Sequence, residues 1–478
     1  MTKYSGAMKL IRQKCFIVFL FFLTPLLLNA KGAKIYTPMM FGWEDAKTGV
    51  EKYWVLYNTH IAAQMDNASV SYEGIKSAEI EIPIDAVTIP LTDKTDFRGI
   101  KLTVVNNSKD FWLFEKKVPL TPISINSENA DNGNYYDTPQ LNKGVYLLSL
   151  ADKTPWVKKR RGYDYGHKRC DLLFIKDGKA RNKPISPYNN EWTEVEASYC
   201  AVSSNKKTIE NLHFFRKEHN KKKVLFVNVE NQYNLEFKNI DFHTPQDTLV
   251  GDALIGVTNC CEVTFKDVWI DGTYSKTDYY GYGICMGNVS NVKFIRLKGN
   301  ANWGVFGNNN VNTAYLKDCD INRFDVHCYG KDIIFESCNF RDLYNQFSSM
   351  FGKVVFKNCE FFNSIPVLFE SSYNAYTNFD LFFKKCIIHP TKWRNYLIYA
   401  GELRGKETDE REEIKVQKYP NLYVNGLTID MKESTDYYLY WFERGIIQWP
   451  IDTIPGIKQV KGLKFIPQKG RKLKVSNC

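Results

Sequence analysis

The strongest constraint on the fold is a repeat between Asn291 and Cys386. Written in register, its five segments read NVKFIRLKGN, AYLKDCDIN, IIFESCNFRD, VVFKNCEFFN and LFFKKCIIHP. Each segment alternates apolar and polar residues and then reaches a turn, which is typical of a short strand with one buried face. A repeat of roughly 20–30 residues indicates stacked units. Because no single segment can bury its own apolar face, neighbouring segments must share one core.

Cysteine occupies the equivalent position in four of these segments, as Cys319, Cys338, Cys359 and Cys386. A leucine-rich repeat would need regular Leu spacing and a helix in each unit, and the segments have neither. We therefore predict an all-β chain whose main part is a right-handed parallel β-helix. At the apolar, inward positions of such a helix, cysteine acts as a small hydrophobic residue. We expect an unbridged stack of thiols.

The rhythm of the repeat divides the chain into six parts. After a leader (residues 1–30) we expect an N-terminal cap of irregular strands (31–69) and the first coils of the solenoid (70–117). A stretch rich in turn residues and basic residues (118–205) breaks the rhythm and indicates an inserted loop or subdomain. The main β-helix (206–435) follows, and the last residues (436–478) form a C-terminal cap. Terminal coils need such caps because they would otherwise expose the core.

The leader has the pattern of an export signal. Four basic residues precede an apolar run, Cys15–Leu28, which is followed by a small-residue cleavage site. That run is shorter than the roughly 20 residues of a membrane-spanning helix, so we predict no membrane span. Removing the four basic residues lowers the net charge from +11 to +7. This mild excess is compatible with an acidic partner, while no motif suggests a nucleic acid.

The remaining cysteines and acids give no metal or cofactor site. The sequence contains no CxxC pair, which a zinc site would favour, and the acids near Asp271 are too few for calcium. Cys170 and Cys200 flank the inserted stretch and are candidates for a disulfide.

One strand combines residues that suit acid/base chemistry. In Arg323-Phe324-Asp325-Val326-His327-Cys328, strand alternation should turn Val326 and Cys328 inward. Asp325 and His327 should then face solvent together, with Arg323 at the strand entrance. A neighbouring carboxylate orients an imidazole and raises its pKa, as an acid/base pair requires. The alternative is a plain polar pair on the surface of a strand.

Further polar and aromatic residues fall on the same expected face, in coils about 4.8 Å apart. Aromatic rings stack on sugar rings, amides bind hydroxyls, and the Arg guanidinium binds carboxylates or sulfates through two hydrogen bonds. The candidates for holding a substrate are Trp303, Asn308, Asn309, Asn310, Arg341, Tyr344, Gln346, Tyr282 and Glu370. The basic, aromatic stretch from Lys158 adds His167 and Arg169, should it fold over this face; otherwise it is a solvated loop.

These coils, with their Asn-rich turns and cysteine ladder, resemble the pectate-lyase-like superfamily of right-handed parallel β-helices. The resemblance covers roughly residues 70–115 and 205–435. It is greatest to exported β-helix proteins of glycan-degrading bacteria, and it implies polysaccharide lyases, glycoside hydrolases or epimerases. The calcium-binding acids and Lys–Arg pairs of well-known pectate lyases have no match here, which argues against pectate cleavage.

The sequence thus predicts an exported bacterial lyase or glycoside hydrolase that cleaves a polysaccharide, with His327 as acid/base, Asp325 as its orienter and Arg323 as an anion or hydroxyl clamp. A non-catalytic glycan-binding or surface-scaffold β-helix is the alternative. A trimer like a phage tailspike is a third possibility, which the export signal argues against.

Overall fold

The computed structural model describes most of the chain from Lys34 onward. The described residues are 34–107, 111–157, 167–185, 195–217, 224–243, 254–271, 282–299, 304–348, 350–369, 378–400, 420–433, 437–442 and 457–466. The predicted leader lies outside them.

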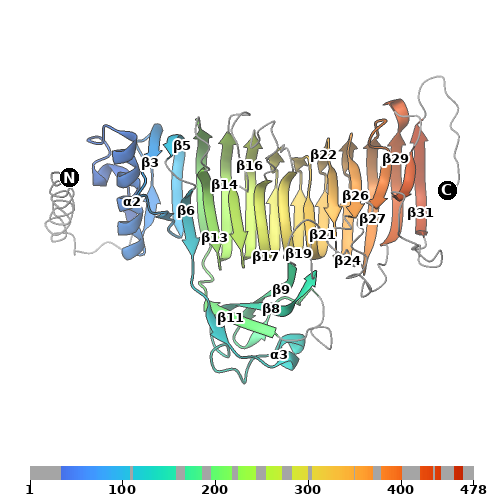
Figure 1. Ribbon diagram of the computed structural model, residues 1–478, viewed down its shortest axis with the longest axis horizontal. Helices are drawn as coiled ribbons and strands as arrows, with labels where there is room; N and C mark the ends of the chain where they lie inside the picture. Colours follow the sequence, from blue (N-terminus) through green and yellow to red (C-terminus); the bar gives the residue numbers. More distant parts are fainter. Residues whose placement is uncertain are drawn as a thin grey trace, which may run out of the picture. The chain divides into compact units, whose positions relative to one another are not determined.

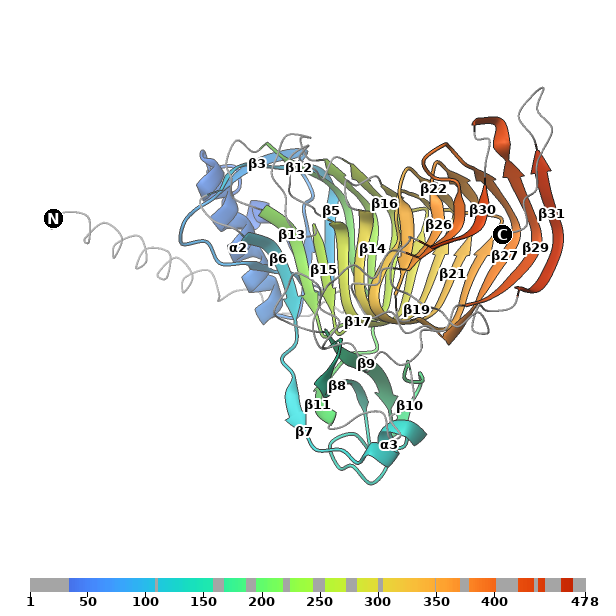
Figure 2. The same cartoon turned by 45° about the vertical axis from the view of Figure 1, so that its right-hand side comes forward.

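Most described strands belong to one sheet that winds into a parallel β-helix (Figures 1 and 2). Within the described residues this sheet has 26 strands, and successive coils pair in parallel. The predicted solenoid is confirmed. Before the insertion the elements are β1 (Ile35–Tyr36), η1 (Pro38–Phe41), α2 (Gly49–Met65), β2 (Ser69–Ser71), β3 (Ser77–Ile82), β4 (Ile89–Pro90), β5 (Lys94–Asn107) and β6 (Phe111–Lys117).

The main solenoid follows the insertion. Its elements are β12 (Lys207–Arg216), β13 (Val224–Glu230), β14 (Tyr233–His243), β15 (Ile255–Thr258), β16 (Cys261–Asp271), β17 (Tyr282–Ile295), β18 (Lys298–Gly299), β19 (Gly304–Lys317), β20 (Asp320–Ile321), β21 (Asp325–Glu336), β22 (Asn339–Arg341), β23 (Tyr344–Phe347), β24 (Met350–Lys357), β25 (Glu360–Phe362), β26 (Ile365–Phe369), β27 (Asn378–His389), β28 (Tyr396–Ala400), β29 (Asn421–Asp430), η4 (Met431–Glu433), β30 (Tyr438–Phe442) and β31 (Ile457–Ile466). Parallel pairing therefore continues past residue 435 into β30 and β31.

One side of the solenoid, which we call the first-strand face, carries the start of each coil. It is formed by β13, β15, the first halves of β17 and β19, the start of β21, and then β23, β26 and β28. Paired residues on neighbouring parallel strands point to the same side. Side chains at one position therefore line up along the solenoid axis, about 4.8 Å apart.

Asparagines turn the chain at the end of this face. Asn259, Asn288 and Asn310 adopt left-handed backbone conformations, with φ of 51°, 53° and 54°. Asn tolerates this region better than other residues with side chains. Asn288 Nδ2 also donates to Asn259 Oδ1 of the preceding coil at 2.7 Å. The Asn-rich turns of the sequence are thus the corners that close each coil.

A continuous apolar core runs through the coils. The rings of Phe335, Phe356 and Phe383 stack in it, with centroid separations of 4.8 and 5.2 Å. The four ladder cysteines are buried and unbridged, as predicted. The Cys359 thiol, for example, donates to the carbonyl oxygen of Phe335 at 3.6 Å.

The N-terminal cap contains a helix, so the expectation of irregular strands there is wrong. Helix α2 begins at a capping box, in which Thr48 Oγ1 accepts from Glu51 N and Glu51 Oε2 accepts from Thr48 N. Tyr53 and Leu56 of this helix are fully buried in the main core. The helix thereby covers the apolar end of the first coil.

The insertion forms a separate antiparallel sheet. Its strand order is β10-β9-β8-β11-β7. The elements are β7 (Thr121–Ile123), α3 (Ser127–Asn132), β8 (Val145–Val157), β9 (His167–Lys176), β10 (Lys179–Ala180) and β11 (Val195–Ala201). Cys170 in β9 and Cys200 in β11 lie on opposite sides of β8, and both are free. The suggested disulfide is therefore wrong.

The inserted sheet rests on the Asn corner at the end of the first-strand face. The backbone N–H of Cys170 donates to Asn310 Oδ1 at 3.1 Å, and Lys331 Nζ donates to the carbonyl oxygen of Pro184 at 2.8 Å. Tyr329, from the same corner, is buried in the apolar core of the insertion. These contacts hold the insertion beside the coils of β17, β19 and β21.

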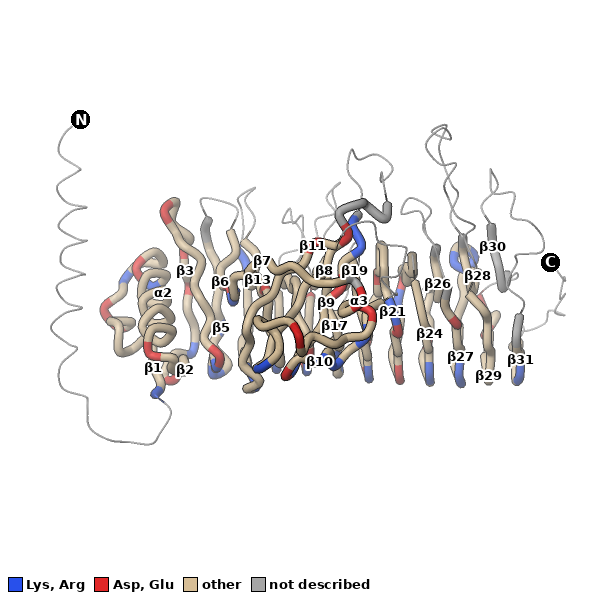
Figure 3. Tube along the Cα trace, turned by 90° about the horizontal axis from the view of Figure 1, so that it is seen from below, with Lys and Arg blue, Asp and Glu red and all other residues tan. Residues whose placement is uncertain are grey.

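Basic residues recur at a different corner, at the end of the second strand of several later coils (Figure 3). Lys357, Lys384 and Lys461 occupy equivalent positions there, in register through Asn425. All three are exposed. This part of the positive charge therefore lies away from the first-strand face.

Candidate functional site

Tyr282, Asp325 and His327 meet on the first-strand face. Tyr282 begins β17 and Asp325 begins β21, two coils further along. Tyr282 Oη lies 2.8 Å from both Asp325 Oδ2 and His327 Nε2. His327 Nε2 in turn lies 2.9 Å from Asp325 Oδ2. Three polar groups from non-adjacent strands thus form one closed hydrogen-bonded cluster.

Gly307 allows Tyr282 to cross the coil between them. It belongs to β19, which pairs with β17 on one side and β21 on the other. A Cβ atom at Gly307 would lie 2.5 Å from a Tyr282 ring carbon, closer than any side chain tolerates. The ring therefore lies against the glycine backbone, and the hydroxyl reaches the next coil.

Arg323 supports the cluster from the other side. Its Nη2 lies 2.6 Å from Asp325 Oδ2 and donates to Gln346 Oε1 at 2.8 Å. The guanidinium carbon is 4.3 Å from the centroid of the Tyr344 ring. Gln346 pairs with Asp325 across β21 and β23. Gln346 of the next coil therefore fixes Arg323, and Arg323 in turn fixes Asp325.

A bulge places His327 within reach of Tyr282. The β19–β21 pairing shifts by one residue, because Asn308 pairs with Val326 but Asn309 pairs with Cys328. Val326 faces the core as predicted, whereas Cys328 contacts Asn309 Oδ1 at 3.4 Å and lies outside the main core. Cys328 is buried, as expected of an inward residue, but it packs beside Asn309 and not in the main apolar cluster, and His327 is the extra residue of the bulge. Bulges re-aim side chains in this way beside functional sites.

The surroundings keep Asp325 ionised. Burial acts to raise the pKa of its carboxyl group. The positive charge of Arg323, together with the electrostatic interaction and hydrogen bond of His327 and the hydrogen bond of Tyr282, outweighs burial and leaves the pKa below its usual value. A buried carboxylate fixed in this way orients the imidazole beside it.

The predicted solvent exposure of this strand is only partly correct. The side chain of Asp325 is 0% exposed and that of Arg323 is 2% exposed, while His327 keeps 13%. Strand alternation predicted the correct side of the sheet, but it did not predict that Asp325 and Arg323 would be buried there. Arg323 is committed to Asp325 and Gln346, so its predicted role as a substrate clamp is not supported.

Asn308 is the clearest error among the predicted substrate-binding residues. It pairs with Met286 and Val326, which both belong to the core, and it is fully buried. Within the described part of the chain, neither its Oδ1 nor its Nδ2 has a hydrogen-bond partner. Asn308 therefore points inward, because its strand position has the parity of Phe306 and not that of Gly307.

The structure gathers Tyr282, Tyr344 and Gln346 around the predicted pair. Asn309 lies beside Cys328, and Asn310 is occupied by the insertion. Arg169 is buried within the insertion, where Nη2 lies 3.1 Å from Asp152 Oδ2. His167 begins β9 and pairs with Val157; only its backbone is described. Trp303 and Glu370 lie outside the described residues.

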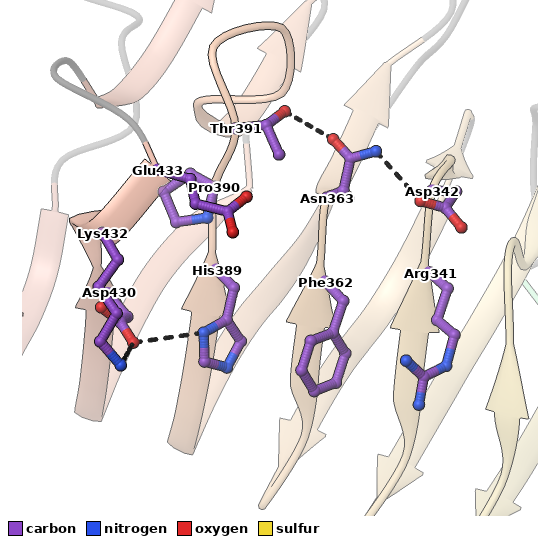
Figure 4. A pocket seen from close by; sticks show the side chains of 10 residues that line it. All are labelled: Arg341, Asp342, Phe362, Asn363, His389, Pro390, Thr391, Asp430, Lys432 and Glu433. Carbon is purple, nitrogen blue, oxygen red and sulfur yellow. Dashed lines mark hydrogen bonds and ion pairs between the residues drawn. The ribbon is translucent and has the colours of Figure 1, made fainter.

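Arg341 belongs to a different surface, so the prediction that it lies on the same face as Asp325 and His327 is wrong. It ends β22 and forms a bidentate pair with Asp320 at 2.6 and 3.0 Å. A pocket of about 340 Å³ opens beside it (Figure 4). The pocket is lined by Arg341, Asp342, Phe362, Asn363, His389, Pro390, Thr391, Asp430, Lys432 and Glu433.

Charges in this pocket are largely paired with one another. Asp430 Oδ2 lies 2.9 Å from Lys432 Nζ and 3.5 Å from His389 Nδ1, and His389 stacks on Phe362 at 4.8 Å. The pocket lies at the ends of the short strands β22 and β25, whereas the hydrogen-bonded acid/base groups lie on the first-strand face. The candidate acid/base groups at His327 therefore lie apart from this pocket.

The described residues hold no group of three or more His, Cys, Asp or Glu side chains placed to bind a metal ion. None of their helices is long and apolar enough to cross a membrane.

Sequence reasoning missed how Tyr282 acts. It was expected only to bind substrate, yet its hydroxyl bonds directly to the Asp–His pair. The available signal was the glycine at position 307, in the coil that lies between those of Tyr282 and Asp325. A glycine there leaves room for a ring to cross.

No protein-family model and no curated protein matches the chain. Among solved structures, the tailspike protein gp49 from Pseudomonas phage LKA1 is similar with a TM-score of 0.53 at 14% identity, covering 85% of this chain and 72% of that chain. The tailspike gp61 of Pseudomonas phage phi297 is similar with a TM-score of 0.49 at 9% identity, covering 89% of this chain and 83% of that chain. The A-module of the mannuronan C-5 epimerase AlgE6 of Azotobacter vinelandii has a TM-score of 0.33 at 10% identity, covering 91% of this chain and 100% of that chain. At such identities the first likeness shows the fold alone, a right-handed parallel β-helix.

Proposed function

We propose that this protein is an exported bacterial polysaccharide lyase that acts on an acidic glycan. The observation that carries the proposal is the closed cluster of Tyr282, His327 and Asp325 on the first-strand face. Tyr and His are proton-transfer groups of the kind a lyase needs, and they lie within hydrogen-bond distance of each other. Asp325 is committed to three partners, which suits an orienting role better than that of a glycosidase acid or nucleophile.

The proposed step is a β-elimination. His327 takes the proton from the carbon next to the sugar carboxylate, and the electron pair of that C–H bond forms a carbon–carbon double bond. The bond between the ring and the glycosidic oxygen breaks, and the phenolic proton of Tyr282 passes to that oxygen. His327 returns its proton to Tyr282 through the 2.8 Å contact between them. Asp325 and Arg323 hold both groups in place.

The geometry of the face also suits a polymer. Coils lie about 4.8 Å apart, so an extended glycan lying along the axis meets one side chain from each coil. Tyr344 and Gln346 follow the cluster in the next coil and are in contact with Arg323. Tyr344, the less buried of the two, is the proposed positioning residue for the sugar next to the cleaved bond, whereas Gln346 is buried and holds Arg323.

Binding without cleavage is the second candidate. The observation in its favour is the burial of Asp325 and Arg323, which leaves His327 as the accessible member of the strand. In that case the cluster would be a structural network beneath a glycan-binding surface.

One experiment separates these functions. Purified protein is incubated with acidic and neutral polysaccharides while both reducing ends and the absorbance of unsaturated uronates are recorded. The variants are His327→Ala and, as matched control, His213→Ala, which removes a histidine that pairs with Asp241 at 2.8 Å on another face. Loss of a general acid/base should slow the reaction roughly 10²–10⁴-fold.

A lyase produces reducing ends and unsaturated uronates in step, with His213→Ala near the wild-type rate and thermal stability of His327→Ala retained. Reducing ends without absorbance would indicate a hydrolase. Retention of a glycan without either product would support the binding alternative. Unchanged turnover by His327→Ala would remove the proposed centre.

A further inference from the structure

The loop between β27 and β28 is longer than the equivalent turns of the two preceding coils and is fixed in place. Thr391 Oγ1 donates to Asn363 Oδ1 at 2.6 Å, and Asn363 Nδ2 donates to Asp342 Oδ1 at 3.1 Å (Figure 4). The N–H of Arg394 closes a turn onto the carbonyl oxygen of Thr391 at 3.2 Å. The loop therefore leans back over the two preceding coils and presents residues 392–394 there.

Arg394 is unusual among the arginines near this region. Arg296 and Arg341 each form bidentate pairs with a carboxylate, to Asp267 and Asp320. The Arg394 guanidinium has no hydrogen bond or ion pair to any part of the chain that the structure describes, although the residue is partly buried. Burial also lowers the pKa of Arg394, against the opposing effects of Asp342 and Tyr344. Partly burying a cation without a partner costs free energy, so the partly buried position of the Arg394 guanidinium needs a reason.

Trp393 stands beside it with an open ring. Its exposed fraction is 80%, the largest of the exposed large hydrophobic residues described. Lys392 Nζ lies 5.4 Å from the centre of that ring. An exposed aromatic ring flanked by cations is suited to stacking on a sugar that carries a negative charge.

The loop is also continuous with the candidate site. Tyr344 lies under the Arg323 guanidinium, and with Asp342 it is one of the two groups that act to raise the pKa of Arg394 against burial. Arg323 in turn bonds to Asp325. A glycan that passes His327 toward the later coils therefore meets Tyr344 and then this loop.

We propose that Trp393 and Arg394 form a subsite that binds an anionic sugar residue of the glycan several units from the cleaved bond. The inference rests on the proposed function and adds the charge of the substrate to it. Lys392 and Arg394 place two basic side chains on this loop, and Asp342 is the carboxylate that acts on Arg394. The guanidinium fork binds carboxylate or sulfate through two parallel hydrogen bonds, whereas Trp393 supplies the stacking surface.

The test is native gel electrophoresis of the full chain in gels that contain polygalacturonate, alginate, heparin or neutral dextran. All variants carry His327→Ala so that the glycan is not consumed. Arg394→Gln and Trp393→Ala are compared with matched controls, Arg98→Gln and Trp269→Ala, which remove an exposed Arg and an exposed Trp elsewhere. Losing one charge-assisted contact should weaken apparent binding roughly tenfold.

The expected result is retardation by a uronate or a sulfated glycan, weakened by both loop variants and by neither control. Polygalacturonate and alginate carry carboxylates, whereas heparin also carries sulfates, so the pattern distinguishes the two anions. Retardation by a uronate or a sulfated glycan that Arg394→Gln does not change would overturn the subsite and leave the proposed function standing. Retardation by dextran alone would count against both the subsite and an acidic substrate. Absence of retardation and of any cleavage product from wild-type protein would overturn both.

Discussion

At the scale of single residues, Asp325 is the group on which the others depend. It accepts contacts from Tyr282, His327 and Arg323 through one oxygen, Oδ2. Removing its charge would leave Arg323 buried without compensation. A buried cation without its partner is far more costly than an exposed one.

Asp325→Asn should therefore destabilise the protein by about 3–5 kcal/mol at pH 7. Asp320→Asn, which removes the partner of the half-exposed Arg341, should cost about 1 kcal/mol or less. Urea unfolding at pH 7 compares the two. Equal effects of the two substitutions would contradict a buried ionic cluster.

The same carboxylate predicts a dependence on pH. Because the folded-state pKa of Asp325 lies below its unfolded value of about 3.9, ionisation stabilises the fold above that pH. That contribution is lost as pH falls below about 4 through the folded-state pKa. The stability gap between wild type and Asp325→Asn should thus narrow at pH 3.

Residue spacing predicted the contact between Asp325 and His327 but not the burial of Asp325. Two residues on one strand face are neighbours whatever the rest of the fold does. Tyr282 and Tyr344 come from other coils, so their approach depends on coil length and on Gly307. The core position of Asn308 was missed because Asn308, Asn309 and Asn310 were placed on the face together, whereas Asn308 pairs with the inward Val326.

At the scale of elements, the cysteine ladder shows what a repeat can predict. Cys319, Cys338, Cys359 and Cys386 each follow a left-handed corner residue, and each points into the core. Burial raises the pKa of the Cys359 thiol far above its usual value. Thiols that stay protonated and enclosed react slowly.

Iodoacetamide at pH 8 should accordingly leave the four ladder cysteines unmodified in the native protein, whereas Cys285, which is exposed, should react. Mass spectrometry of the digested protein measures each site. After unfolding in denaturant all of them should react without any reductant. A ladder cysteine that is labelled in the native state, or found in a disulfide, would contradict the buried free stack.

At the scale of the whole molecule, the solenoid continues across the insertion. β5 pairs with β12 and β6 pairs with β13, although the inserted sheet separates them in sequence. Lys117 pairs with Glu230, and Lys207 pairs with Leu235. Val118 and Ser204 are therefore equivalent to Asn231 and Gln232, a two-residue turn of the next coil.

Deleting residues 119–203 should join these coils in register. The shortened protein should retain the β-sheet circular dichroism and melt cooperatively, several degrees lower because Tyr329 loses its apolar cover. Circular dichroism with a thermal scan checks this. An unfolded or aggregated product would show that the insertion is needed to build the solenoid.

The sequence was most informative where the pattern repeats. Coils, corners and the inward cysteines follow from alternation and turn residues that recur along the chain. The helix of the cap and the loop at Arg394 occur once, so no second copy marks them. Arg341 was misplaced because its strand, β22, is too short for alternation to show which face of the solenoid it occupies.

The central claim is that the Tyr282 hydroxyl, held by Asp325 and His327, takes part in the reaction. The most direct test is the rate of unsaturated product formation by Tyr282→Phe, with Tyr315→Phe as matched control, since Tyr315 also bonds to a carboxylate, Glu336, at 2.6 Å. The account predicts a loss of roughly 10²-fold or more for Tyr282→Phe and a near wild-type rate for Tyr315→Phe. Equal rates for the two variants would contradict it.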